Sequence, residues 1–182
     1  RGVLKHATAS GKTYTALDAV RRHTDNGDPA IILVRGKDLL TQWAGEISRF
    51  FASNDVALIP CGSEHSEWKT SGSVDTHTDP ALVMPERRIV LASLDTAVRE
   101  EFLGQLHAGE HLLVVCDEVH HFGTASRRPF DEIEAGARLG LSATPERWAD
   151  PDGTTAIFNY FGPILEPVIT LADAVQLGRL CQ

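Results

Sequence analysis

Residues 2–13 read GVLKHATASGKT, and this stretch decides the fold because a short apolar strand leads through small residues into a helix. Leu17 and Val20 continue the helix as its buried face. Small residues let backbone N–H groups and the positive end of the helix dipole close around a phosphate chain. The stretch therefore predicts a phosphate-binding loop. Its expected nucleotide-binding residues are Thr8, Ala9, Ser10, Gly11, Lys12 and Thr13.

Two side chains of this loop have specific expected roles. The Lys12 ammonium reaches the β- and γ-phosphates, and the Thr13 hydroxyl ligates Mg²⁺. The pattern departs from G-x-x-x-x-G-K-[ST], since His6 stands at the first glycine, and Ala9 stands where related loops often have another. An alanine is strained where φ is positive, so Ala9 is the greater departure.

Outward from this loop, short β-rich runs alternate with helical patterns, which favours an α/β fold with helices on both faces of a mostly parallel sheet. Several runs are apolar at consecutive positions, as strands buried on both faces are. The expected strands are Gly2–Lys5, Ala30–Val34, Val56–Pro60, Arg88–Ala92, Leu112–Cys116 and Arg138–Ser142.

Two helical faces with a spacing of four residues are expected between the strands. One comprises Leu39, Trp43, Ile47 and Phe51, and the other Leu94, Val98, Phe102 and Leu106. Residues 61–86 break this rhythm with Gly, Ser, Thr and charged residues, so we interpret them as a long surface insertion without regular structure.

A second candidate site follows the apolar strand Leu112–Cys116, which ends in Asp117 and Glu118. Open α/β sheets bind ligands at this edge. We expect Asp117 to hold Mg²⁺ through its water shell and Glu118 to activate the attacking water. An exposed acidic turn is the alternative. Lys12, Asp117 and Glu118 together form the predicted catalytic set for Mg-nucleotide hydrolysis, with ATP and Mg²⁺ as cofactors.

Composition narrows the setting of this site. The 182 residues fit one domain, and no apolar run is long enough to cross a membrane, so a cytoplasmic protein is expected. The formal net charge of −8 argues against a purely electrostatic nucleic-acid binder, although helix N-termini and backbone amides can still contact phosphates. The three cysteines suggest no disulfide framework.

The sequence resembles the superfamily 2 helicases, in the branch that contains type III restriction subunits and the xeroderma pigmentosum group B helicase. Besides ATASGKT and DEVH, the matching stretches are ILVRGKDLLTQW at 32–43, VLAS at 90–93, LGLSATPER at 139–147 and YFGP at 160–163. The resemblance implies a three-layer α/β/α RecA-like P-loop NTPase fold over residues 1–165. Residues 166–182 would begin the connection to a second RecA-like domain of the same polypeptide.

The resemblance also implies roles for further residues. Arg35, Gly36 and Ser93 match positions that bind the sugar-phosphate backbone, and Arg35 stands where the family usually has proline. His120, Ser142, Ala143 and Thr144 match positions that couple the nucleotide state to nucleic-acid grip and to the second domain.

In such proteins the second domain supplies the arginine fingers, and a segment before the phosphate loop recognises adenine; neither is expected in residues 1–182. Isolated, this chain should bind ATP weakly and hydrolyse it poorly.

The predicted function is the ATP-binding motor domain of a helicase or translocase on DNA, with RNA as the alternative nucleic acid. Nuclease or methyltransferase subunits are further candidate partners. Two other classes stay open. A P-loop regulatory NTPase or kinase with a non-nucleic-acid partner would not need the motifs at 32–43 and 142–145. The second is a nucleotide-binding scaffold that has lost catalysis; the intact set Lys12, Thr13, Asp117 and Glu118 argues against it, and Ala9 is the only feature in its favour.

Overall fold

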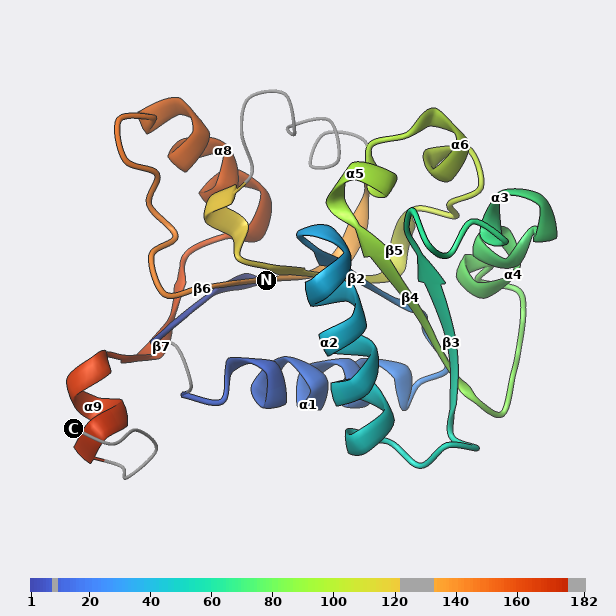
Figure 1. The fold of residues 1–182 in the computed structure, drawn as a ribbon, viewed down its shortest axis with the longest axis horizontal. Coiled ribbons are helices and arrows are strands. Elements are labelled where there is room, and N and C mark those ends of the chain that lie inside the picture. Colours follow the sequence, from blue (N-terminus) through green and yellow to red (C-terminus); the bar gives the residue numbers. More distant parts are fainter. Residues whose placement is uncertain (8–9, 122–132, 177–182) are drawn as a thin grey trace.

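The computed structural model describes residues 1–7, 10–121 and 133–176, and the described part contains one seven-stranded sheet (Figure 1). The strand order is β3-β4-β2-β5-β6-β1-β7, and each neighbouring pair is parallel, which confirms the predicted sheet. The strands are β1 (Gly2–His6), β2 (Ala30–Val34), β3 (Val56–Cys61), β4 (Arg87–Ser93), β5 (Gly109–Asp117), β6 (Ala135–Ser142) and β7 (Ile164–Ile169).

Helices cover both faces of this sheet and complete a three-layer α/β/α arrangement (Figure 1). The helices are α1 (Lys12–Thr24), α2 (Gly36–Phe50), α3 (Trp68–Ser71), α4 (Ser73–Thr78), α5 (Leu94–Ala97), α6 (Glu100–Leu103), the 3₁₀ turn η1 (Val119–His121), α8 (Pro151–Phe161) and α9 (Leu171–Gln176). Within the described ranges, none of them is both long and apolar enough to cross a membrane.

Two separate hydrophobic clusters lie on the two faces of the sheet. On β2, Ile31 and Leu33 pack with the cluster that includes residues of α3 to α6 and α8. Ala30, Ile32 and Val34 point the other way and pack with residues of α1 and α2. Because successive strand residues face opposite sides, a strand covered on both faces is apolar at every position. This explains the consecutive apolar runs of the sequence.

The prediction of a structureless surface insertion at residues 61–86 was wrong. The stretch forms α3 and α4 and packs on the same face as α5 and α6. Trp68 is 2% exposed and meets Phe102 edge to face at 5.6 Å between ring centroids. Val74 is fully buried in the same cluster. An aromatic side chain of this size supplies enough apolar contact to fix two helices too short to be stable alone.

The apolar face predicted at residues 94–106 is divided between two helices instead of lying on one. Helix α5 ends at Ala97, and the backbone of Arg99 is extended before α6 begins. Leu94 and Phe102 are both buried in the same cluster, so the spacing identified the buried side chains but not the break.

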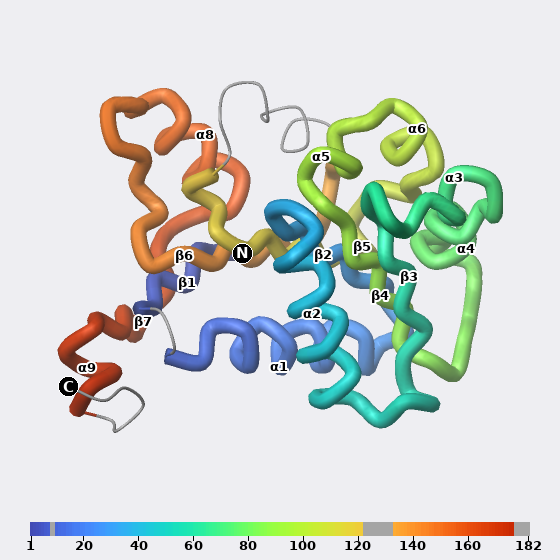
Figure 2. The backbone as a smooth tube through the Cα atoms, viewed as in Figure 1, coloured from blue at the N-terminus to red at the C-terminus, as the bar shows by residue number. Residues whose placement is uncertain are grey.

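The sheet continues past the predicted domain boundary at residue 165. Strand β7 spans Ile164–Ile169, pairs in parallel with β1 and is followed by α9. Figure 2 shows α9 beyond the edge strand β7, at the opposite end of the molecule from α3 and α4. A connection to a second domain over residues 166–182 stays a prediction.

Candidate functional site

The segment predicted to bind phosphate lies between β1 and α1, at the carboxyl edge of the sheet. Gly11 precedes the helix with φ 93° and ψ 21°, a left-handed conformation that glycine adopts without strain. Just before it, the Ser10 hydroxyl donates to the carbonyl of Ala7 at 2.6 Å. Thr8 and Ala9 lie outside the described residues, so the conformation expected at Ala9 stays a prediction.

The acidic pair ends β5, two strands away from β1 in the sheet. Asp117 is 9% exposed, and its Oδ2 accepts a hydrogen bond from the indole Nε1 of Trp43 at 2.8 Å. Burial raises the pKa of the Asp117 carboxyl, the Trp43 hydrogen bond opposes this, and the nearby Glu118 charge adds to it. A buried carboxylate held in place by an indole is suited to bind a cation that restores its charge balance.

Glu118 has an uncommon backbone conformation for a residue with a side chain, with φ at 49°. Its backbone N–H donates to Asp117 Oδ1 at 3.0 Å. Residues held in the left-handed region are concentrated at functional sites, where the surrounding structure stabilises the strain. This turn directs the two adjacent carboxylates differently: Asp117 lies inward against Trp43, and Glu118 faces the phosphate loop.

The two sequence motifs meet in space. Lys12 Nζ lies 3.6 Å from Glu118 Oε1, although the residues are far apart in the chain. Their side chains are only 11% and 29% exposed, so solvent screens this pair less than it screens a surface pair. The sheet therefore brings the predicted phosphate-binding ammonium and the predicted base to one edge.

The predicted coupling residues form a chain of contacts beside this pair. His120 Nδ1 lies 3.2 Å from Glu118 Oε2 and 2.8 Å from the hydroxyl of Ser142, which is fully buried. The Ser142 hydroxyl also accepts the backbone N–H of Thr144 at 3.1 Å. Ala143 lies between them and is half-buried. Polar contacts thus connect the acidic turn with the loop after β6.

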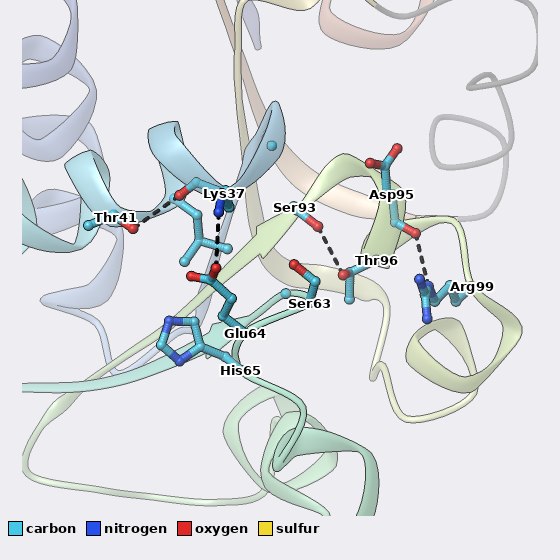
Figure 3. A pocket seen from close by; sticks show the side chains of 12 residues that line it. Lys37, Thr41, Ser63, Glu64, His65, Ser93, Asp95, Thr96 and Arg99 are labelled. Carbon is cyan, nitrogen blue, oxygen red and sulfur yellow. Dashed lines mark hydrogen bonds and ion pairs between the residues drawn. The ribbon is translucent and has the colours of Figure 1, made fainter.

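Gly36 and Ser93, two of the three predicted nucleic-acid contacts, line a pocket of about 180 Å³ at the ends of β2, β3 and β4 (Figure 3). Gly36 has φ 73° and begins α2, so the amino end of a 15-residue helix faces the pocket. Ser93 donates to the Thr96 hydroxyl at 2.9 Å. This combination of helix N-terminus and hydroxyls is suited to a phosphate.

Arg35, the third predicted contact, lies beside this pocket and not in its lining. Its Nη1 donates to the His121 imidazole, with Nδ1 at 3.1 Å. Burial lowers the pKa of His121, and the neighbouring Arg35 charge lowers it further, which favours the neutral imidazole that can accept this bond.

The structure adds residues that the motifs did not identify. Lys37 and Glu64 form an ion pair at 3.2 Å across the pocket, and Arg99 lies on its far side with Nε donating to the Asp95 carbonyl at 3.2 Å (Figure 3). Trp43, predicted only as a core residue, orients Asp117. Lys37 directly follows the predicted contact Gly36, which was a usable signal, whereas Arg99 is not adjacent to any predicted contact. The Trp43 contact spans 74 positions and had no such signal.

Comparison with known proteins adds a family and a fold. The family model described as "Type III restriction enzyme, res subunit" matches residues 1–147. A curated relative, the "Putative DNA 3'-5' helicase Rad25" of Haloarcula marismortui, is 29% identical over 162 residues, covering 89% of this chain. The chain spans only 22% of that relative's length.

Solved structures agree with the fold. The nuclease-deletion mutant of the type ISP restriction-modification enzyme LlaGI, in complex with a DNA substrate mimic, has a TM-score of 0.71 at 17% identity, covering 98% of this chain and 19% of that one. The Pyrococcus furiosus Hef helicase domain has a TM-score of 0.65 at 17% identity, covering 93% of this chain and 34% of that one. These similarities confirm the RecA-like α/β fold.

Proposed function

Because the chain belongs to the family of type III restriction enzyme res subunits, we propose that it is the ATP-binding motor domain of a DNA helicase or translocase. The observation that carries the proposal is the meeting of Lys12 and Glu118 at 3.6 Å, beside the buried Asp117. A phosphate-binding ammonium, a candidate base and a candidate metal ligand at one sheet edge are what Mg-nucleotide hydrolysis requires. The name of the curated relative supports DNA as the track.

The residues present fit ATP and Mg²⁺. Lys12 and the amino end of α1 offer a cation and backbone N–H groups to phosphates, while Thr13 and Asp117 offer the hard oxygen ligands that Mg²⁺ prefers. The metal, when bound, would neutralise charge on the phosphates. In our proposal Lys12 binds the β- and γ-phosphates, and Glu118 holds and deprotonates the attacking water.

The coupling role rests on the contacts of His120. Its ring lies between Glu118 and Ser142, so a change in the position of Glu118 on hydrolysis would alter the bond to the loop after β6. Gly36 and Ser93, in the neighbouring pocket, would bind the sugar-phosphate backbone of one strand together with Arg35 beside it. Contacts of this kind grip nucleic acid without reading its sequence.

A second RecA-like domain of the parent would complete the cleft and supply arginine fingers, and nuclease or methyltransferase subunits are proposed further partners in the cytoplasm. The relative's greater length leaves room for such parts. A P-loop kinase or regulatory NTPase is not favoured, because the family match extends beyond the phosphate loop and acidic pair to residue 147.

The proposal is tested by ATP turnover of the parent protein with and without nucleic acid. We expect duplex or single-stranded DNA to raise the turnover rate. Turnover that no DNA or RNA changes would contradict a nucleic-acid motor and return the regulatory NTPase as the better explanation.

A further inference from the structure

Trp148 is 97% exposed, in contrast to the other two tryptophans of the chain, Trp43 and Trp68, which are 1% and 2% exposed. It lies in the loop between β6 and α8, a few residues after the predicted coupling residue Thr144. Leaving a whole indole in water forgoes a large hydrophobic gain. A tryptophan is also the residue type that most often dominates protein interfaces.

The residues on both sides of Trp148 have a fixed conformation. Arg147 donates from Nε to Asp150 at 2.7 Å, from Nη1 to the carbonyl of His120 at 2.5 Å, and from its backbone N–H to the Thr154 hydroxyl at 2.9 Å. Ala149, on the other side, has φ 56°, a conformation that is strained for alanine. The surroundings therefore fix a backbone shape that the residues themselves do not prefer.

The indole borders an open hollow of about 800 Å³ whose lining includes His120, His121, Thr144 and Glu146. His120 and Thr144 are in the contact chain that reaches Glu118 and Ser142. The hollow is thus connected through His120 to Glu118 at the proposed nucleotide edge, and it is lined by residues predicted to couple to the second domain.

The charges of this hollow are already paired within the domain. Glu146 bonds Lys5 at 2.7 Å, and Arg147 bonds Asp150 at 2.7 Å. The His121 imidazole accepts from Arg35. A phosphate site needs cations that can turn to the ligand, whereas a protein interface combines a central aromatic anchor with a rim of satisfied polar groups. The hollow matches the second description.

We propose that Trp148 anchors the docking of the second RecA-like motor domain onto this domain when the nucleotide cleft closes. The inference rests on the proposed function, because it assumes that such a domain completes the cleft. Docking inserts the indole into the partner's surface and gives closure a specific anchor next to the coupling residues. Without a docked domain the Trp148 side chain is exposed to water.

The test uses tryptophan fluorescence of the parent protein, with the Trp148→Phe spectrum subtracted so that the difference reports Trp148 alone. Three additions are compared: a non-hydrolysable ATP analogue with Mg²⁺, single-stranded DNA, and both together. We expect a shift of the difference spectrum to shorter wavelength whenever the analogue is present, and no change with DNA alone. A change with DNA alone would show base stacking and overturn the proposal, as would no change in all three samples.

A second readout is ATP turnover of Trp148→Ala in the parent. Losing an interface anchor should lower DNA-stimulated turnover at least about tenfold while leaving DNA affinity without nucleotide unchanged. Val83→Ala, at a side chain 92% exposed and far from the hollow in sequence, is the control and should match the wild type. If DNA stimulates turnover of the wild type and of Trp148→Ala to the same rate, the docking inference fails and the motor function stands. If wild-type turnover ignores every nucleic acid, the motor function itself fails.

Discussion

The carboxyl edge of the sheet contains two sites built in opposite ways. At the first, here called the inner site, the functional groups at the ends of β1, β5 and β6 are largely buried: Lys12 is 11% exposed, and Asp117 is buried against Trp43. At the second, here called the outer site, which surrounds the outer pocket at the ends of β2, β3 and β4, the charged groups are exposed: Lys37 and Glu64 are 64% and 61% exposed. Buried charges have large effects when one partner is removed, whereas exposed pairs contribute little. Single substitutions at the inner site should therefore change ATP turnover strongly, whereas single substitutions at the outer site should change nucleic-acid affinity only slightly.

The largest effect is expected from Lys12→Ala, in the inner site. Among the described residues, Lys12 is the only Lys or Arg that forms an ion pair with Glu118. The substitution removes this ammonium, which is also the group proposed to bind phosphate. ATP turnover of the parent should fall at least about a hundredfold, as when one charge-stabilising donor is lost. Arg22→Ala, on the same helix with a side chain 74% exposed, is the control and should retain turnover. Retained turnover in Lys12→Ala would remove the phosphate-loop assignment.

The next effect is on stability, in the core between α3 and α6. Trp68→Ala leaves a cavity under α3 and beside Phe102, so unfolding of residues 1–182 in urea should show a loss of about 3–5 kcal/mol. Trp148→Ala makes the same chemical change on an exposed side chain and should stay within about 0.5 kcal/mol of the wild type. Equal losses in the two variants would contradict the packing of residues 61–86 onto the core.

A smaller effect, of opposite sign, is expected from Glu64→Gln in the outer pocket. The substitution frees Lys37 from its ion pair and removes a negative charge that repels phosphates. DNA affinity of the parent, measured by fluorescence anisotropy, should rise by no more than about fivefold, the scale of an exposed pair. Glu67→Gln, in the same loop but outside the pocket lining, should change it less. Weaker binding by Glu64→Gln would show that Glu64 helps to hold the ligand.

The smallest effect is a pH dependence of stability that arises at His77 in α4. His77 donates from Nδ1 to the Ser73 carbonyl, and burial lowers its pKa below the ordinary 6.5. The unfolded chain then binds the proton more readily than the folded chain, so this contribution to stability is present above pH 6.5 and is lost as the pH falls below it. The melting temperature, measured from pH 7.5 to 5.5, should fall less steeply in His77→Gln than in the wild type. An unchanged decline would remove His77 as its source.

The inner site could be predicted well from sequence because its parts are local. Strand, loop and helix follow one another in residues 2–13, and Asp117 and Glu118 directly follow the apolar run Leu112–Cys116. That Lys12 and Glu118 come close, at 3.6 Å, followed from the parallel sheet, because a parallel sheet places the carboxyl ends of its strands at one edge. The hydrogen bond from Trp43 could not be predicted, because periodicity shows only that a residue faces inward and not which polar atom it meets.

Gly36 and Ser93 of the outer site were predicted, but the helices α3 and α4 beside it and the edge strand β7 were not, because these elements are short or irregular. Helices α3 and α4 have four and six residues, too few for a helical period to show. Strand β7 contains Pro167 and half-exposed residues, as an edge strand does, and so lacks the continuous apolar run that marks the inner strands. Trp148 looks like any apolar residue in a polar loop until its exposure is known.

Glu118→Gln tests the central claim most directly, because this residue joins the phosphate loop through Lys12 and the loop after β6 through His120. ATP binding and DNA-stimulated hydrolysis should be measured on one preparation of the parent protein. We predict that ATP binding is retained within a few-fold while hydrolysis falls about a hundredfold or more, since the glutamine amide keeps the shape of the glutamate side chain but cannot take a proton. Equal loss of binding and hydrolysis, or undiminished hydrolysis, would contradict it.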